Sequence, residues 1–218
     1  TEPDISSSEE ASIFILKLRS ILRYLDTCDG NMQDGSLRAD LNVSVKKPNE
    51  VNGTRCEIKN MNSIKFIRQA INYEAKRQIQ IIENGGIIKQ DTLLFDVESG
   101  KTRSMRNKED AHDYRYFPDP DLLPLELNDN FISEIKLEIP ELPDQRKIKY
   151  IKKYNLSNYD ASMLIEDRET SDYFDSIMNI DSSFEKYSKL IVNWITSELF
   201  ALLKKEDIGI KNCPISPK

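Results

Sequence analysis

The sequence predicts an α+β fold in which an antiparallel sheet with flanking helices is followed by a small all-α helical domain. Residues 37–45 and 54–60 alternate apolar and polar side chains, which is the pattern of half-buried strands. Residues 8–25 and 63–83 instead repeat apolar side chains every three or four positions, as amphipathic helices do. Past residue 128 only the helical pattern remains.

The predicted helices have recognisable ends. Ser7 and Glu10 have the spacing of a capping box at the start of helix 8–25. Helix 63–83 can be capped by Asn62 or Ser63, and it ends at a pair of glycines. The face that this second helix is expected to bury carries Ile64, Ile67, Ile71, Ala75, Ile79 and Ile82.

The strands are expected to pair as hairpins, because turn residues separate them. A loop with an Asn52-Gly53 pair joins the first two strands. The turn at 98–101 joins a second pair, 93–95 and 102–106. Hairpins in place of repeated βαβ units predict an antiparallel sheet.

We place a domain boundary near residue 128. Residues 1–128 form the predicted sheet-containing domain. Residues 129–218 form the predicted helical domain with its linker, in which Pro140 and Pro143 bound helices.

The composition narrows the possible chemistry. The 218 residues include 31 Lys and Arg against 37 Asp and Glu, a formal net charge of −6, and 39% apolar residues suffice for a core. The three cysteines are widely separated and His112 is the only histidine, so neither a disulfide framework nor a Cys/His metal cluster is expected. No P-loop or Rossmann glycine motif is present, so if the protein binds ATP it does so without either motif.

The sequence also bears on the compartment. It has no apolar run of the roughly 20 residues that cross a bilayer. The cysteine usage and the lack of such a run predict a soluble protein in a reducing, cytosol-like compartment. Because the chain begins with Thr1 and not Met, we expect a portion of a longer protein.

One face of the first hairpin carries candidate site residues. Polar side chains lie two apart along each strand: Arg38, Asp40, Asn42 and Ser44 on the first, and Arg55, Glu57 and Lys59 on the second. Such side chains are about 6.5–7 Å apart on one face. The spacing alone favours an ordinary solvated face with cross-strand ion pairs. The other interpretation is a site whose carboxylates hold a divalent metal and whose cations hold phosphate.

Two further segments carry cations. Arg103, Ser104 and Arg106 lie on strand 102–106, where the arginines could bind oxyanions bidentately, although surface strands often carry arginine. The segment 112–118 interleaves three aromatic residues with a histidine and Arg115. It is either a structural corner whose rings pack on the sheet or a ligand contact.

Seven short motifs follow one another through the first 118 residues. They are Glu2-Pro3-Asp4, Asp29-Gly30-Asn31-Met32, Gly35-Ser36-Leu37-Arg38, Asp40-x-Asn42-Val43-Ser44-Val45, Gly53-Thr54-Arg55-x-Glu57-Ile58-Lys59-Asn60, Thr102-Arg103-Ser104-Met105-Arg106 and His112-Asp113-Tyr114-Arg115-Tyr116-Phe117-Pro118. In this order they resemble GatB, the B subunit of the aspartyl/glutamyl-tRNA(Asn/Gln) amidotransferase. The resemblance extends through the helical part, and it implies that the family's N-terminal segment and C-terminal tail domain are missing.

The resemblance implies a fold and an activity. The catalytic domain of such proteins is similar to glutamine synthetase and the guanidino kinases, with an antiparallel sheet and helices outside. The family's complex, GatCAB, is a carbon–nitrogen ligase that uses ATP and Mg²⁺ to convert Glu-tRNA(Gln) or Asp-tRNA(Asn) into Gln-tRNA(Gln) or Asn-tRNA(Asn). Its partners are the amidase GatA, which releases ammonia from glutamine, and the small bridging protein GatC. This portion alone is expected to be inactive.

The resemblance also implies roles for the candidate residues. The expected catalytic residues are Arg38, Asp40, Glu57 and Lys59. The expected metal ligands are Glu2 and Glu57, with Asp40 and Asn42 completing the shell directly or through water. The residues expected to bind nucleotide or phosphate are Asn42, Arg103, Ser104, Arg106 and Arg115.

The alternative is a non-catalytic module that docks tRNA or assembles the same complex. A run of lysines in the helical domain, Lys147, Lys149, Lys152 and Lys153, motivates it. A solvated helix face explains the same lysines and is the stronger interpretation.

Overall fold

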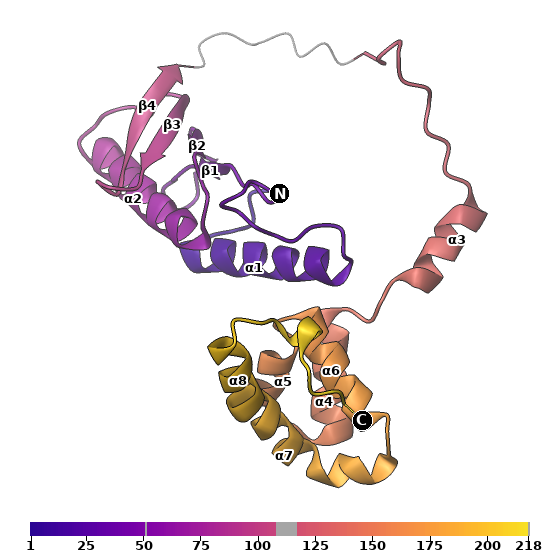
Figure 1. The fold of residues 1–218 in the computed structure, drawn as a ribbon. Helices are drawn as coiled ribbons and strands as arrows, with labels where there is room; N and C mark the ends of the chain where they lie inside the picture. The colour runs from indigo at the N-terminus through magenta and orange to yellow at the C-terminus, as the bar shows by residue number, and fades with distance from the viewer. Residues whose placement is uncertain (51, 108–116, 218) are drawn as a thin grey trace. The chain divides into compact units, whose positions relative to one another are not determined.

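The structure is a computed structural model that describes residues 1–50, 52–107 and 117–217 (Figure 1). The chain divides into two compact units. The first consists of Thr1–Arg19 and Asp29–Ile132, and the second of Ser20–Cys28 and the chain from Ser133 onward. Among the described residues, no helix is both long enough and apolar enough to cross a bilayer.

The first unit contains a four-stranded sheet in the order β1-β2-β3-β4. Its elements, in chain order, are α1 (Ser8–Tyr24), which runs on into the second unit, β1 (Leu41–Val43), β2 (Cys56–Lys59), α2 (Ile64–Glu83), β3 (Asp91–Asp96) and β4 (Lys101–Asn107). The α+β class and both predicted hairpins, β1 with β2 and β3 with β4, are confirmed.

The sheet is mixed, whereas the sequence predicted an antiparallel one. β2 and β3 pair in parallel, with Glu57 opposite Thr92 and Ile58 opposite Leu93. The reason is α2, whose 20 residues span about 30 Å and return the chain to the edge at which β2 began. The two hairpins are therefore joined by a helical crossover.

The alternating strand pattern separates the two faces of the sheet as predicted. The apolar side chains form a core with the helices, whereas Asn42 is exposed and Glu57 is only half-buried. The strand residues buried in this core are Val43, Cys56, Ile58, Leu93 and Phe95.

The helix starts follow the predicted capping chemistry. The Ser63 hydroxyl oxygen accepts a hydrogen bond from the Phe66 amide at 3.2 Å. The Ser7 hydroxyl oxygen likewise accepts a hydrogen bond from the Glu10 amide at 3.1 Å. The Glu10 carboxylate, however, accepts a hydrogen bond from the Ser6 amide and not from the Ser7 amide. The capping residues thus predicted both helix starts correctly. The one difference from a capping box is that the backbone amide bound by the Glu10 carboxylate lies one residue earlier.

The buried face of α2 differs from the predicted one. Ile67 is buried as expected, but Ile79 is 43% exposed, and the helix buries Glu74 and Gln78 in its place. The helix is rotated because these two polar side chains find hydrogen-bond partners under the sheet, which removes the usual cost of burying them.

Glu74 is the centre of this buried network. Its carboxylate accepts two bonds from the Arg77 guanidinium, at 2.7 and 2.9 Å, one from the Gln78 amide at 2.8 Å and one from the Thr102 hydroxyl at 3.1 Å. Burial acts to raise the pKa of Glu74, but these hydrogen bonds outweigh it and hold the pKa below 4.5. Glu74 is therefore buried as a carboxylate.

The second unit is helical. Its elements are α4 (Pro143–Tyr154), α5 (Asn158–Leu164), α6 (Arg168–Met178), the 3-10 helix η1 (Ser182–Tyr187), α7 (Ser188–Asn193), the π-helical segment η2 (Trp194–Leu199), α8 (Phe200–Lys205) and the short η3 (Ile210–Asn212). Phe174 packs edge-on against Tyr150 and Tyr154, with ring centroids 5.1 and 5.6 Å apart. The units divide within α3 (Asp129–Glu138), none of whose side chains is buried.

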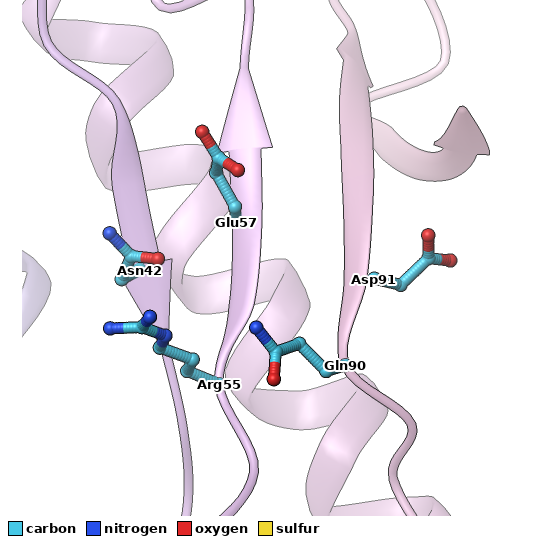
Figure 2. A pocket seen from close by; sticks show the side chains of 5 residues that line it. All are labelled: Asn42, Arg55, Glu57, Gln90 and Asp91. Carbon is cyan, nitrogen blue, oxygen red and sulfur yellow. The ribbon is translucent and has the colours of Figure 1, made fainter. Parts of the chain in front are cut away.

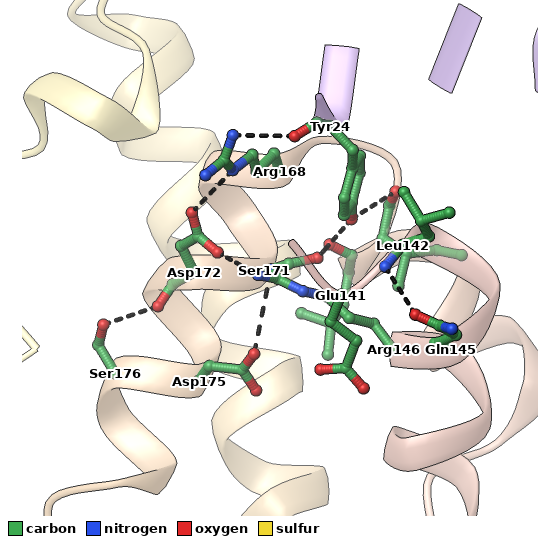
Figure 3. A network of polar contacts seen from close by, with 12 residues as sticks. Tyr24, Glu141, Leu142, Gln145, Arg146, Arg168, Ser171, Asp172, Asp175 and Ser176 are labelled. Atoms are coloured by element: carbon green, nitrogen blue, oxygen red, sulfur yellow. Dashed lines mark hydrogen bonds and ion pairs between the residues drawn. The ribbon is translucent and has the colours of Figure 1, made fainter. Parts of the chain in front are cut away.

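Tyr24 anchors the end of α1 in the helical unit (Figure 3). Its hydroxyl lies 2.7 Å from the Ser171 hydroxyl and donates to the Ile165 carbonyl at 3.1 Å. The Arg168 guanidinium donates to the Tyr24 carbonyl at 2.8 Å, and Arg146 lies over the Tyr24 ring. A residue far away in sequence thus completes the core of the helical unit.

Removing the α2 cap should measure how much the Ser63 hydroxyl stabilises the first unit. We expect Ser63→Ala to lower the free energy of unfolding by about 1 kcal/mol, because the Phe66 amide loses its partner. The control Ser63→Thr keeps a capping oxygen and should stay close to the parent protein in urea denaturation. Equal stability of all three proteins would show that the cap contributes nothing.

The buried carboxylate predicts a dependence of stability on pH. Since the folded pKa of Glu74 lies below 4.5, its contribution is full above that value and is lost as pH falls through the folded pKa. We expect Glu74→Gln to cost about 1–3 kcal/mol at neutral pH. Urea unfolding at decreasing pH should show the difference from the parent shrinking in the acid range. A difference that does not vary with pH would contradict a carboxylate in this position.

Candidate functional site

The polar face of the sheet is organised by strand register. Asn42 on β1 lies opposite Glu57 on β2, which lies opposite Thr92 on β3. Paired residues point to the same face, so these three side chains form a row across three strands. The Thr92 hydroxyl lies 3.5 Å from a Glu57 carboxylate oxygen, and the Glu57 side chain is only 16% exposed.

A charge triad extends from Glu57 of this row to residues beside it on the same face. The Lys59 ammonium lies 2.8 Å from the Glu57 carboxylate and 2.9 Å from the Asp40 carboxylate. The hydrogen bonds to Glu57 and then to Asp40 raise the pKa of Lys59 above 10.5. The predicted catalytic residues Asp40, Glu57 and Lys59 are therefore brought together, with one cation between two carboxylates.

A small pocket opens beside this triad, lined by Asn42, Arg55, Glu57, Gln90 and Asp91 (Figure 2). Figure 2 shows the Gln90 side chain reaching toward β2, whereas the Asp91 carboxylate points away from the other side chains. The pocket thus combines carboxylate and amide oxygens, which suit a hard cation, with a guanidinium, which suits an oxyanion.

Two residues of the pocket, Arg55 and Gln90, were assigned no role in the predicted site. Arg55 was nevertheless expected on this face, because it shares the alternation of Glu57 and Lys59 along one strand. No sequence pattern marked Gln90, which reaches this face only because β3 runs parallel to β2.

Strand β4 contributes its residues to different faces. Arg103 pairs with Leu94 of β3, and Leu94 pairs with Lys59 of β2. Arg103 therefore lies on the charged face, two strand spacings or about 9.5 Å from Lys59. Ser104 instead pairs with Leu93, whose side chain is in the core. Ser104 is therefore on the helix-facing side and is not brought together with the other candidates. Arg103 and Ser104 face opposite sides because successive residues of a strand alternate.

Two candidates fall partly or wholly outside the described residues. The backbone of Arg106 pairs with Thr92, which places it in the row of Asn42 and Glu57, but its side chain is outside what the structure describes. Arg115 and the rest of 108–116, with His112, lie outside the described residues altogether. Their roles stay predictions.

Two candidates remain, Arg38 and Glu2. The Arg38 guanidinium packs beside the turn at Gly35, where the backbone has φ of +81° and an added Cβ would approach Arg38 to 3.0 Å. Glu2 is exposed near the start of the chain. Among the described residues, no group of three or more His, Cys, Asp and Glu side chains is placed to hold a metal. The proposed metal roles of Glu2 and Glu57 therefore need ligands besides protein carboxylates.

Two of the four lysines that motivated a docking module form ion pairs. Lys149 bonds Glu141 at 2.6 Å and Asp175 at 3.3 Å, and Lys153 bonds Glu185 at 3.3 Å. Carboxylates within the unit thus neutralise part of the positive face of α4. This pairing agrees with a solvated helix face and gives no support to a phosphate-binding surface.

Comparison with known proteins places the chain in a family. The sequence model of the GatB/GatE catalytic domain family matches residues 1–133, more than half of the chain. The chain belongs to this family. The match covers every strand of the sheet, and with it the charge triad and the pocket.

Relatives match along almost the whole chain. The B subunit of the aspartyl/glutamyl-tRNA(Asn/Gln) amidotransferase from Methylobacterium nodulans is 56% identical over 216 residues, which is 99% of this chain and 43% of the relative. Proteins of the same name from Azorhizobium caulinodans and Pelagibacter ubique are each 55% identical over 100% of this chain. The chain spans less than half the length of these relatives, 43–44%.

The charge triad is predicted to contribute little to stability. Because Lys59 and Asp40 are 39% and 51% exposed, a double-mutant cycle with Asp40→Asn and Lys59→Met should give a coupling of only about 0.2–1 kcal/mol. The coupling should decrease further in high salt, since dissolved ions screen exposed charges. A coupling of several kcal/mol that salt leaves unchanged would contradict an exposed pair and would make the triad a structural element.

Proposed function

We propose that this chain is the part of a GatB amidotransferase subunit that activates the side-chain carboxylate of Glu-tRNA(Gln) or Asp-tRNA(Asn), using ATP and Mg²⁺. The observation that carries the proposal is the charge triad of Asp40, Glu57 and Lys59, beside the pocket that Asn42 lines. It lies within the region that matches the GatB/GatE catalytic domain. The name of the relatives supplies the substrate class.

Activation of a carboxylate by ATP requires a surface with charged groups in fixed positions. A carboxylate is a poor electrophile, so a carboxylate oxygen first attacks the γ-phosphorus and the bond to the departing ADP breaks. The acyl phosphate then loses phosphate as ammonia forms the new C–N bond, and the surplus protons pass to solvent. Phosphoryl transfer depends chiefly on positioning and on charge stabilisation, and little on covalent chemistry by the protein. A face of fixed cations and carboxylates suits that requirement.

The residues present fit a magnesium ion that phosphate groups help to hold. Bound Mg²⁺ supplies neutralisation of the phosphate charge. It is usually held by one or two carboxylates together with waters and substrate phosphates, so a full cluster of protein carboxylates is not required. Glu57 would be the main ligand, Asn42 would offer an amide oxygen from the same pocket, and Glu2 would be the second carboxylate.

Cations on the same face would hold the transferred phosphoryl group. Lys59 has its ammonium fixed by Glu57 and Asp40, which keeps it charged and oriented before substrate arrives. Arg103 lies two strands away on the same face. Arg38, Arg106 and Arg115 complete the proposed phosphate-binding set, while Ser104 is omitted because it points to the opposite face.

The proposed assembly follows from the same family. The amidase GatA would release ammonia from glutamine and pass it to the acyl phosphate, and the small protein GatC would join the two larger proteins. We propose that the complex acts as a ligase of protein biosynthesis in the bacterial cytoplasm or an organellar matrix.

The direct test is Glu57→Gln in the full-length GatCAB complex. We expect phosphorylation of Glu-tRNA(Gln), measured as γ-phosphate transfer from labelled ATP, to fall by at least about a hundredfold, because a preorganised charge is lost. The glutaminase activity of GatA should be largely unchanged. The matched control is Glu98→Gln, which makes the same change on the exposed turn between β3 and β4 and should leave phosphorylation unchanged. Full phosphorylation by Glu57→Gln would refute the proposed role.

A further inference from the structure

The two edge strands of the described sheet, β1 and β4, are each paired along one side only. β1 pairs with β2 over only three residues, Leu41–Val43. β4 pairs with β3 through a register shift between Thr92 and Leu93. An edge strand has ladder hydrogen bonds along one side only, and the backbone groups on its other side are unpaired. Yet these strands carry Asn42 and Arg103 of the proposed site.

A chain of buried hydrogen bonds connects the two edges beneath the sheet. From β4, the Thr102 hydroxyl donates to Glu74 at 3.1 Å, and the Gln78 amide donates to the same carboxylate at 2.8 Å. The Gln78 side chain then reaches the chain at β1, donating to the Val43 carbonyl at 3.0 Å and accepting from the Val45 amide at 3.1 Å. Two adjacent turns of α2 thus link opposite edges of the sheet.

The link resists displacement because its members are buried. Glu74 and Gln78 both have 0% exposure, so any shift of an edge strand would leave a buried polar group without a partner. Arg77 balances the charge of Glu74 and also lies 3.7 Å from the Cys56 sulfur on β2. The network therefore contacts β1, β2 and β4 from one helix.

Packing alone does not account for these residue types. Apolar side chains at positions 74 and 78 would hold α2 against the sheet equally well, since a buried ion pair rarely adds net stability over an apolar contact. Apolar contacts are not directional, whereas hydrogen bonds fix a distance and an orientation. The edges that they fix are three strand spacings apart, about 14 Å.

We propose that Glu74, acting with Gln78, is a positioning residue that sets the separation of β1 and β4 and thereby of Asn42 and Arg103 on the opposite face of the sheet. This inference rests on the proposed function, because it assigns the positioned side chains to ATP and its transferred phosphate. Glu74 touches neither substrate nor metal in this scheme, and it acts only through the strands.

The test is a conservative pair at the β4 end of the link. Thr102→Val removes the hydroxyl that donates to Glu74 and keeps the side-chain shape, whereas Thr102→Ser keeps the hydroxyl. In the full-length complex, we expect Thr102→Val to raise the KM for ATP in Glu-tRNA phosphorylation by about 10- to 100-fold, since small misplacements cost that much. Thr102→Ser should restore a KM close to that of the parent complex.

The KM for ATP distinguishes a misplaced site from a smaller amount of folded enzyme. Partial unfolding lowers the apparent kcat and leaves the KM of the remaining enzyme unchanged. A Thr102→Val complex with reduced kcat and an unchanged KM for ATP would therefore overturn the proposal. So would a Thr102→Ser complex as impaired as Thr102→Val.

Amide hydrogen exchange tests the link without reference to activity. In Thr102→Val, amides of residues 101–105 should exchange faster than in the parent, while those of β2 keep their protection. Unchanged exchange in β4 would overturn the positioning role whatever the reaction is. Failure of the proposed function would appear separately, as full Glu-tRNA phosphorylation by Glu57→Gln.

Discussion

The sheet-containing unit depends on burying one ionised carboxylate, that of Glu74, without leaving it unsatisfied. Two bonds from Arg77, one from Gln78 and one from Thr102 meet this requirement. The rotation of α2 on the sheet follows, since the helix must bring these side chains beneath it. The crossover that places β3 parallel to β2 uses the same helix.

Because side chains alternate along each strand, one face of the sheet forms the core and the other carries the charged residues. Toward the helices it presents apolar residues such as Ile58 and Phe95, which form the core. Toward the other side it presents charged residues such as Asp40 and Lys59, whose exposed ion pair contributes little to folding and is available for chemistry. A site on a sheet face is also rigid, because ladder hydrogen bonds hold its side chains in register.

Local patterns in the sequence were enough to predict the strands, both hairpins and helix α2, because each depends on periodicity or on turn and capping residues nearby. The triad was predictable for the same reason, since Glu57 and Lys59 share one strand face. Three features depend on residues distant in sequence and could not be predicted this way: the parallel pairing that brings Gln90 to the pocket, the burial of Glu74, and the place of Tyr24 in the helical unit. Alternation alone places Ser104 on the face opposite Arg103, whereas no local pattern marks the register shift that pairs Arg106 with Thr92.

The central claim is that the charged face of β1 and β2 receives the triphosphate. The most direct measurement is a structure of the complete amidotransferase complex with Mg²⁺ and a non-hydrolysable ATP analogue. We predict the γ-phosphate over the row of Asn42 and Glu57, with the metal on the Glu57 carboxylate and Lys59 turned toward phosphate. A nucleotide bound elsewhere, with the Glu57–Lys59 ion pair intact and facing solvent, would contradict this account.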